Sequence, residues 1–292
     1  MPMRSEPSFT VIIPAHNEEA VIARCLKAMQ SVEGDDSAMQ VIVAANGCSD
    51  NTVNAAINAM PSAIVLNLAE GSKAGAINAG IDLASHPVVI VLDADIECSF
   101  TALAALAAAA AVDGIMTAAP GIRMDLSRSN WLVRAYYRAW ARQPYALSGK
   151  GGAGCYCISA EGLRQIGRFP LIIADDIWIH TRFADHQTKY VTQDDAGRAV
   201  FTIVRPPRTA IEQIRVEARR RIGNAEVRQF HSTEHWSGSN AQSWLRTALR
   251  SGARPMDLLI FLVMKTLARL LARWRVSRGH VAWTRDLTSR QF

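Results

Sequence analysis

Short apolar runs alternate with segments of helical spacing over the first half of the chain. The apolar runs, rich in valine and isoleucine, predict strands at residues 9–13, 41–45, 63–68 and 88–92. Apolar positions at helical spacing between and after them predict helices at 20–32, 53–59, 73–83 and 100–112. Strands and helices that alternate in this way form right-handed βαβ units with a mostly parallel sheet.

The alternation stops beyond Met116. From there the patterns predict a helix at 131–140, a strand at 155–159, a helix at 161–166 and an arginine-rich helix at 211–228. The expected fold class is therefore α/β, with a Rossmann-like central sheet flanked by helices and a helical, basic C-terminal extension.

Charge is unevenly distributed along the 292 residues, although the composition, with 49% hydrophobic and 20% charged residues, is ordinary for a globular protein. From Arg205 onward the sequence has 17 Lys and Arg against 6 Asp and Glu. The preceding residues have 15 against 20. A near-neutral to acidic body with a basic tail fits an anionic substrate, a membrane surface or nucleic acid as partner.

The C-terminal part holds one strongly apolar run, at residues 258–263, with Lys265, Arg269 and Arg273 after it. This run is far shorter than the roughly 20 apolar residues that span a bilayer. An amphipathic helix here would either lie on an anionic membrane or pack on the catalytic body with a solvated basic face. The sequence leaves both alternatives open.

The five cysteines show no paired spacing typical of a metal site, and their odd number predicts reduced thiols. The first seven residues contain no apolar run of the kind found in a signal peptide. We therefore expect a cytoplasmic protein, with peripheral contact to the inner face of the plasma membrane as an open alternative.

Two carboxylates follow the apolar run at 88–92, in the sequence Asp93-Ala94-Asp95. Ligands bind outside the carboxyl ends of the strands in open α/β sheets. Carboxylate pairs suit a hard divalent cation, Mg²⁺ or Mn²⁺, which in turn would hold a diphosphate. The pair therefore predicts a site for a nucleotide and a metal.

Polar segments also follow the earlier predicted strands. The hexapeptide Pro14–Glu19 stands after the first strand, with Asn17 as candidate N-cap of the next helix. The turn Asn46–Thr52 stands after the second, and Lys73 opens the third helix among small residues. The Lys73 segment lacks the Gly-Lys-Ser/Thr ending of a P-loop, which disfavours a P-loop NTPase.

Several later residues have both a functional and a structural interpretation. Asp175 and Asp176 would be catalytic acids or a helix cap, and His180, four residues on, a metal ligand or a packed histidine. In the glycine-rich loop, Gly152 and Gly154 would admit an acceptor close to the backbone. Trp140 would line an acceptor groove or belong to the core.

Taken together, these segments resemble the family 2 glycosyltransferases of the GT-A fold. The matching segments are PAHNEE at 14–19, NGCSDNT at 46–52, KAGAINAG at 73–80 and DAD at 93–95. Ala174-Asp175-Asp176 stands where the family has its acidic pair, and the run 219–223 resembles its arginine/tryptophan motif. Each motif alone is weak, but their order along the chain is specific.

The resemblance implies a role for each matching residue. Pro14, Ala15, His16, Glu18 and Asn46 would border the nucleoside, with Lys73 nearby. Asp93, Ala94 and Asp95 would lie at the ribose and the metal-bound diphosphate. Asp176 would be the catalytic base, with Asp175 supporting it, and Arg220 and Arg221 would reach the diphosphate or the acceptor.

Three positions depart from the family pattern. Asn46 stands where many members have an acid, Asp175 replaces a commoner glutamate, and Arg221 replaces a tryptophan that is common in processive synthases. The departure at Arg221, and the short apolar run near the C-terminus, argue against a processive polymerase.

The resemblance implies a domain organisation and an activity. We expect a catalytic domain at 1–205, with a donor half at 9–115 and an acceptor half at 116–205, and a helical region at 206–292. The expected activity is inverting, metal-dependent transfer of a sugar from a nucleoside diphosphate, with UDP favoured, to a glycan, lipid-linked or small-molecule hydroxyl acceptor.

Two other functions stay open at this stage. A nucleotidyltransferase would need a glycine-rich basic loop after the first strand, where this chain has Pro14-Ala-His-Asn. A non-catalytic protein that binds nucleotide, or nucleic acid through its arginines, would not need Asp93, Asp95 and Asp176 together. We therefore expect no nucleic-acid partner.

Overall fold

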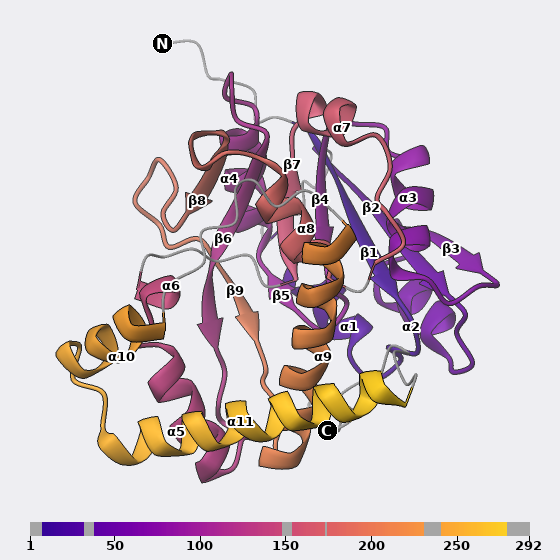
Figure 1. Ribbon diagram of the computed structural model, residues 1–292. Coiled ribbons are helices and arrows are strands. Elements are labelled where there is room, and N and C mark those ends of the chain that lie inside the picture. Colours follow the sequence, from indigo (N-terminus) through magenta and orange to yellow (C-terminus); the bar gives the residue numbers. More distant parts are fainter. Residues whose placement is uncertain (1–7, 32–37, 148–153, 173, 231–240, 279–292) are drawn as a thin grey trace. The chain divides into compact units, whose positions relative to one another are not determined.

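A computed structural model describes residues 8–31, 38–147, 154–172, 174–230 and 241–278 (Figure 1). The chain forms two compact units. The sheet unit comprises Met1–Arg123 and Gly151–Val204, and the helical unit comprises Met124–Lys150 and Arg205–Phe292. The division at 204/205 lies beside our expected boundary, whereas residues 124–150, which we assigned to the acceptor half, group with the C-terminal helices.

The sheet unit is built on a nine-stranded sheet of order β3-β2-β1-β4-β7-β6-β9-β5, with β8 paired to β6. The strands are β1 Phe9–Ala15, β2 Met39–Asn46, β3 Ile64–Leu68, β4 Val88–Leu92, β5 Glu97–Cys98, β6 Thr117–Met124, β7 Cys155–Ile158, β8 Thr188–Val191 and β9 Phe201–Val204. The first four are parallel, and β7 is antiparallel to both β4 and β6. The mostly parallel α/β sheet is confirmed.

Helices of the sheet unit follow the predicted alternation. They are α1 Ile22–Ala28, α2 Thr52–Ala59, α3 Lys73–Asp82, α4 Phe100–Ala110, α7 Ala160–Ile166 and α8 Asp175–Arg182, with a 3-10 turn, η1, at Asp185–Gln187. Every residue of β1 and β4 is buried, and six residues of α4 are buried as well. The apolar runs at 9–13 and 88–92 therefore became strands covered on both faces, as their composition predicts. The run at 63–68 became the edge strand β3, which is partly exposed.

The start of α1 differs from our expectation. Asn17 does not cap a helix, because α1 begins at Ile22 after Val21. Instead, Asn17 adopts a positive φ of 51°, and its side-chain oxygen accepts a hydrogen bond from the Ser49 N–H at 2.6 Å. The predicted helix was also too long, since α1 ends at Ala28. Asn17 joins the loops after β1 and β2, which periodicity along one segment cannot reveal.

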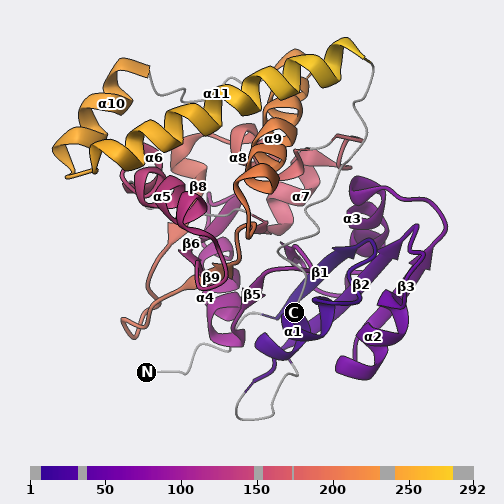
Figure 2. The same ribbon diagram turned by 90° about the horizontal axis from the view of Figure 1, so that it is seen from below.

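The helical unit contains α5 Trp131–Trp140, α6 Pro144–Leu147, α9 Ala210–Phe230, α10 Ala241–Arg250 and α11 Pro255–Ser277. The long helix α11 packs against α5 and α9 (Figures 1 and 2). The aromatic rings of Tyr136 and Phe261 stack there with centroids 4.8 Å apart. None of the helices in the described ranges is long and apolar enough to cross a membrane.

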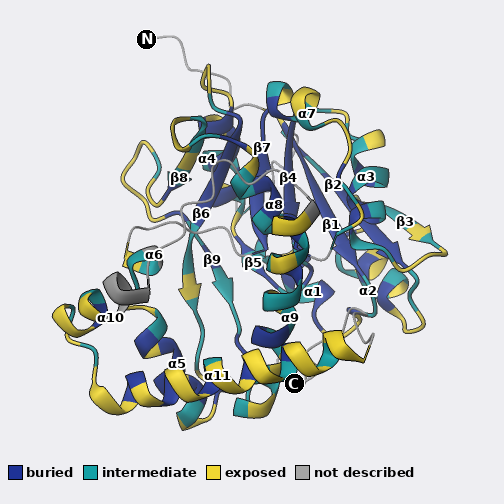
Figure 3. Ribbon diagram, in the orientation of Figure 1, coloured by how far each residue is buried: buried dark blue, intermediate teal, exposed yellow. Residues whose placement is uncertain are grey.

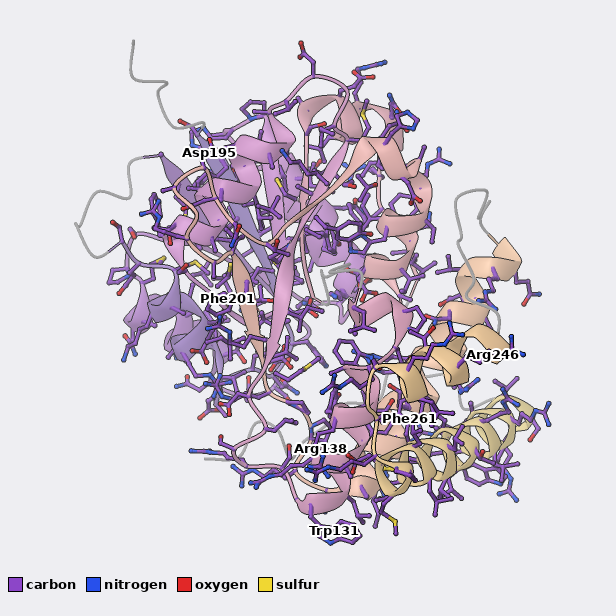
Figure 4. The ribbon with its side chains drawn as sticks, turned by 90° about the vertical axis from the view of Figure 1, so that its left-hand side faces the viewer. Trp131, Arg138, Asp195, Phe201, Arg246 and Phe261 are labelled. Carbon is purple, nitrogen blue, oxygen red and sulfur yellow. The ribbon has the colours of Figure 1, made fainter. Side chains whose placement is uncertain are left out.

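Two ion pairs join α11 to the other helices of its unit. Arg138 donates to both carboxylate oxygens of Asp257, at 2.8 and 2.7 Å (Figure 4). Glu217, whose side chain is only 4% exposed, pairs with Lys265 of α11 and with Arg220 one turn along α9. Burial raises the pKa of Glu217, but Lys265 and Arg220 outweigh burial and lower the pKa.

Gly80 provides a test of the packing between α3 and β1. A Cβ at this position would lie 2.5 Å from a methyl carbon of the fully buried Ile12. Although alanine favours helix, we expect Gly80→Ala to lower the free energy of unfolding by about 1–3 kcal/mol through overpacking. Urea unfolding measures this, with Ala79→Ser on the same helix as control. A stabilised Gly80→Ala protein would contradict the packing.

Glu217 predicts a dependence of stability on pH. Because its pKa is lowered on folding, the ionised group stabilises the fold above about pH 4.3, and this contribution is lost as pH falls through the folded pKa. Lys265→Met leaves Arg220 as the one remaining basic partner that the structure shows for the buried carboxylate, so we expect a loss of about 3 kcal/mol at pH 7. The loss should shrink towards pH 4–5 as Glu217 takes up a proton. Thermal unfolding against pH measures it, Lys265→Arg is the control, and a loss independent of pH would contradict the assignment.

Candidate active site

The candidate site lies at the carboxyl ends of the parallel strands in the sheet unit. Asp93 follows β4 directly, Lys73 opens α3 after β3, and Asp175 and Asp176 begin α8. Strand ends of this kind form the ligand-binding crevice of open α/β sheets. Residues far apart in the sequence are thereby brought to one place.

Lys73 bridges two of these carboxylates. Its ammonium nitrogen lies 2.7 Å from Oδ1 of Asp93 and 2.8 Å from Oδ1 of Asp175. The Asp175 side chain is 2% exposed, whereas that of Asp93 is 31% exposed. Of the two carboxylates that Lys73 bridges, Asp93 is therefore the one that a ligand can reach.

Tyr156 completes the cluster and was not among the residues that we singled out. It lies on β7, in register with Val91 of β4, and its hydroxyl donates to Oδ2 of Asp175 at 2.8 Å. Tyr156 is fully buried, so Asp175 is held from both sides by Lys73 and Tyr156. The sequence shows a tyrosine, with its polar hydroxyl, inside the apolar strand Cys155–Ile158, but it does not indicate that Asp175 accepts its hydrogen bond.

The electrostatics of the cluster follow from burial and proximity. Burial raises the pKa of Asp93 to about 6, and Asp175 and Asp95 add to the rise, while Lys73 opposes it. Burial disfavours charged Lys73, but Asp175, Asp93 and Asp176 outweigh this effect and raise its pKa. Burial and Asp175 raise the pKa of Tyr156 as well. Lys73 thus stays an ammonium among crowded carboxylates that favour a further cation.

Asp176 differs from its neighbour in its surroundings. It is partly exposed, and its Oδ1 accepts a hydrogen bond from the Ile177 N–H at 2.8 Å. Both acids lie in the first turn of α8, where the helix dipole stabilises negative charge. The pair therefore divides into a buried, fixed carboxylate at Asp175 and an accessible one at Asp176.

Gly154 lies against Asp93. Its carbonyl accepts the Asp93 N–H at 2.7 Å, and a Cβ at Gly154 would lie 2.6 Å from Oδ2 of Asp93. Its φ of +66° also requires glycine. The structure thus places this predicted acceptor residue beside the carboxylate at the end of β4.

The predicted nucleoside-binding residues gather at the ends of β1 and β2. Pro14 and Ala15 are the last residues of β1, and His16 hydrogen-bonds through Nδ1 to the Asn46 carbonyl. Asn46 is buried, and its amide donates to the carbonyls of Ala15 and Ala44 at 2.8 and 3.2 Å. Asn46 therefore holds two strand ends together.

Close backbone contact fixes the next turn. Gly47 has a φ of +56°, and a Cβ there would lie 2.7 Å from the Gly71 nitrogen. Glu18 is buried and donates its N–H to the Thr52 hydroxyl at 2.7 Å. The loops after β1, β2 and β3 are thus joined into one rim.

Of the remaining predicted residues, three belong to the helical unit. Gly152 lies outside the described residues. Trp140 packs edge-on against Tyr137 in the helical unit, the core alternative that we left open. Arg220 and Arg221 lie on α9 in the same unit.

His180 has aromatic neighbours. Its ring stacks on Tyr190 with centroids 6.0 Å apart and meets Tyr156 edge-on at 6.3 Å. A packed histidine explains these contacts, and nothing in them supports a metal ligand.

The residues of this site fit a divalent cation that binds together with a diphosphate. Among the described residues, no cluster of three or more His, Cys, Asp or Glu could hold a metal. Asp93 and Asp95 would supply one or two oxygen ligands, and phosphate oxygens and water would supply the rest. Sites with few protein ligands are usual for Mg²⁺ bound with phosphates. The residues present therefore fit a metal that arrives with a diphosphate.

Sequence comparison identifies the family. Residues 10–160, more than half of the chain, match the profile of "Glycosyl transferase family 2". The chain belongs to this family. The predicted resemblance is thus confirmed.

Two similar proteins agree with this assignment. The probable glycosyltransferase YdaM of Bacillus subtilis (strain 168) is 32% identical over 106 residues, which are 32% of this chain and 24% of that protein. The mannosyltransferase PcManGT from Pyrobaculum calidifontis, solved in complex with GDP-Man and Mn²⁺, superposes with a TM-score of 0.63 at 18% identity. The superposition covers 92% of this chain and 88% of that one, and it confirms the GT-A fold.

The hydrogen bond from Tyr156 to the buried Asp175 predicts an effect on stability. Tyr156→Phe removes one of the two groups that hold buried Asp175, so we expect a loss of about 1–2 kcal/mol in the free energy of unfolding. Denaturant unfolding measures this loss. Phe169→Leu is the control, because it removes a ring that stacks on Tyr156 but leaves the hydrogen bond.

A double-mutant cycle separates this bond from general packing. If Tyr156 acts through Asp175, the effects of Tyr156→Phe and Asp175→Asn should not add, since the two residues share one interaction. Additive losses would show that the hydroxyl contributes nothing through Asp175.

Proposed function

We propose that this glycosyltransferase moves a sugar from a nucleoside diphosphate to a hydroxyl acceptor, with inversion at the anomeric carbon and with a divalent metal. The observation that carries the proposal is that the three carboxylates differ in exposure and in their contacts. Asp93 is reachable and crowded by negative charge, Asp175 is buried and fixed, and Asp176 is accessible beside it.

The donor would bind along the rim formed by the loops after β1, β2 and β3. His16 and the residues around Asn46 offer backbone and side-chain groups to a nucleoside there. Our expectation of a uridine donor stays a prediction. Because the similar mannosyltransferase was solved with GDP-Man, guanosine donors form the second arm of the test.

Asp93 and Asp95 would hold the metal, Mg²⁺ or Mn²⁺, together with the diphosphate. When bound, the cation supplies stabilisation of the negative charge on the departing diphosphate. The Lys73 ammonium pairs with both Asp93 and Asp175, so it reduces the repulsion between these carboxylates and fixes their positions. The role that the resemblance implies for Arg220 and Arg221, at the diphosphate or the acceptor, stays a prediction.

Asp176 would serve as the general base. As the acceptor oxygen attacks the anomeric carbon, a glycosidic bond forms, the bond from that carbon to the diphosphate breaks, and Asp176 takes the hydroxyl proton. The nucleoside diphosphate leaves with the electron pair. Asp175 does not need to react, because Lys73 and Tyr156 occupy both of its oxygens.

A panel of UDP and GDP sugars tests the donor. Each sugar nucleotide is supplied with Mn²⁺ or Mg²⁺ and a set of sugar and lipid-linked acceptors, and release of nucleoside diphosphate is measured. We expect release with one nucleotide class, abolished by a chelator and restored by metal. Binding of nucleotide without turnover on any donor would favour the non-catalytic alternative.

Asp176→Asn tests the base. The amide cannot accept the proton, so we expect turnover to fall by about 100- to 10,000-fold. Donor affinity and thermal stability should change little, since Asp176 is partly exposed and lacks the buried contacts of Asp175. Asp195→Asn, on an exposed turn of the same unit, is the matched control (Figure 4). Full activity in Asp176→Asn would exclude Asp176 as the base.

A further inference from the structure

The helix α11 is apolar on two faces. One face, which includes Leu258, Phe261, Met264 and Ala268, is buried against α5 and α9. This packing accounts for only part of the apolar sequence of the helix. A surface helix of a globular protein is normally polar on its outer side.

The outer side of α11 is apolar instead. Its exposed residues at helical spacing are Met256, Leu259, Val263, Leu267, Leu270 and Trp274, each between 45% and 62% exposed. Residues 259, 263, 267, 270 and 274 recur every three or four positions, so they form one stripe along the helix. We call these five residues the outer stripe, and Figure 3 shows exposed positions along the whole of α11. An apolar patch of this length is typical of an interaction site.

Arginines border the outer stripe. Arg269 and Arg273 are exposed, lie one turn apart on the same side, and form no ion pair with any other described residue. Asp257 is the only acidic residue in the sequence of α11, and Arg138 neutralises it. The outer side therefore combines apolar surface with uncompensated positive charge.

We propose that the outer stripe docks on the surface of an anionic lipid bilayer. A helix with apolar side chains bordered by arginines lies in the plane of a membrane, with the apolar groups below the headgroups and the guanidinium groups at the phosphates. Trp274 suits the same interfacial depth. The stripe is roughly 20 Å long at 1.5 Å per residue, which gives room for several lipids.

Charge favours this partner over a second copy of the chain. Pairing two outer stripes would bring arginines of both copies to one interface without acidic partners on α11, which is unfavourable. Anionic headgroups supply the missing negative charge. The proposal concerns a surface of the helical unit and does not depend on the reaction at the sheet unit.

The test uses the full chain and two kinds of vesicle. Sedimentation measures binding to phosphatidylcholine vesicles and to vesicles of phosphatidylcholine mixed with phosphatidylglycerol. We expect binding to the anionic vesicles only, weakened by salt. Arg269→Gln with Arg273→Gln should reduce this binding about 25-fold, since each arginine near an anionic surface contributes about fivefold. Leu267→Ser with Leu270→Ser should reduce it at least as strongly.

Matched controls lie in the sheet unit. Leu83→Ser changes an exposed leucine and Arg168→Gln an exposed arginine, and neither should alter vesicle binding. Circular dichroism and thermal unfolding check that the α11 variants are folded, which is expected because all four side chains are exposed. The assay contains neither donor nor acceptor, so its result is separate from that of the activity panel.

Several results would overturn the proposal. These are no binding to anionic vesicles, equal binding to neutral vesicles, or binding unaffected in both double variants. A dimer in light scattering that both double variants convert to monomer would assign the outer stripe to a second copy instead.

Discussion

The contact of the Lys73 ammonium with two carboxylates is the interaction on which the site depends. Asp93 and Asp175 come from segments about eighty residues apart, and bringing them together costs free energy unless a cation lies between them. Lys73 meets this requirement from the first turn of α3. The arrangement fixes Asp175, leaves Asp93 reachable, and places Asp176 next to the fixed acid.

A second constraint operates in the helical unit. There Glu217 and Asp257 are nearly buried, and each is neutralised by a basic residue from another helix, Lys265 or Arg138. These pairs join α11 to α5 and α9. The inward side includes the buried Leu258, Phe261 and Met264, whereas the outer stripe is exposed. The helix α11 thus contributes one side to the core of the helical unit and presents an apolar surface on its other side.

Much of the sheet unit follows from the sequence by simple rules. Apolar runs of about five residues gave parallel strands, which are buried except for the edge strand β3. The polar segments after them converged because parallel strands end at one edge. The order of the motifs along the chain predicts Lys73, Asp93 and Asp175 as site residues without reference to their contacts. The start of α1 could not be predicted, because Asn17 binds a residue of another loop instead of its own helix.

The sequence by itself determined the fold class, the family and the carboxylates at the strand ends, because these depend on local periodicity and on the order of short motifs. Tertiary structure alone decided that Tyr156 holds Asp175 and that Asn46 braces two strands, since both contacts join segments whose spacing carries no signal. It also decided which leucines of α11 are buried. Helical periodicity shows that a helix has an apolar face, but only packing against α5 and α9 selects the one that turns inward.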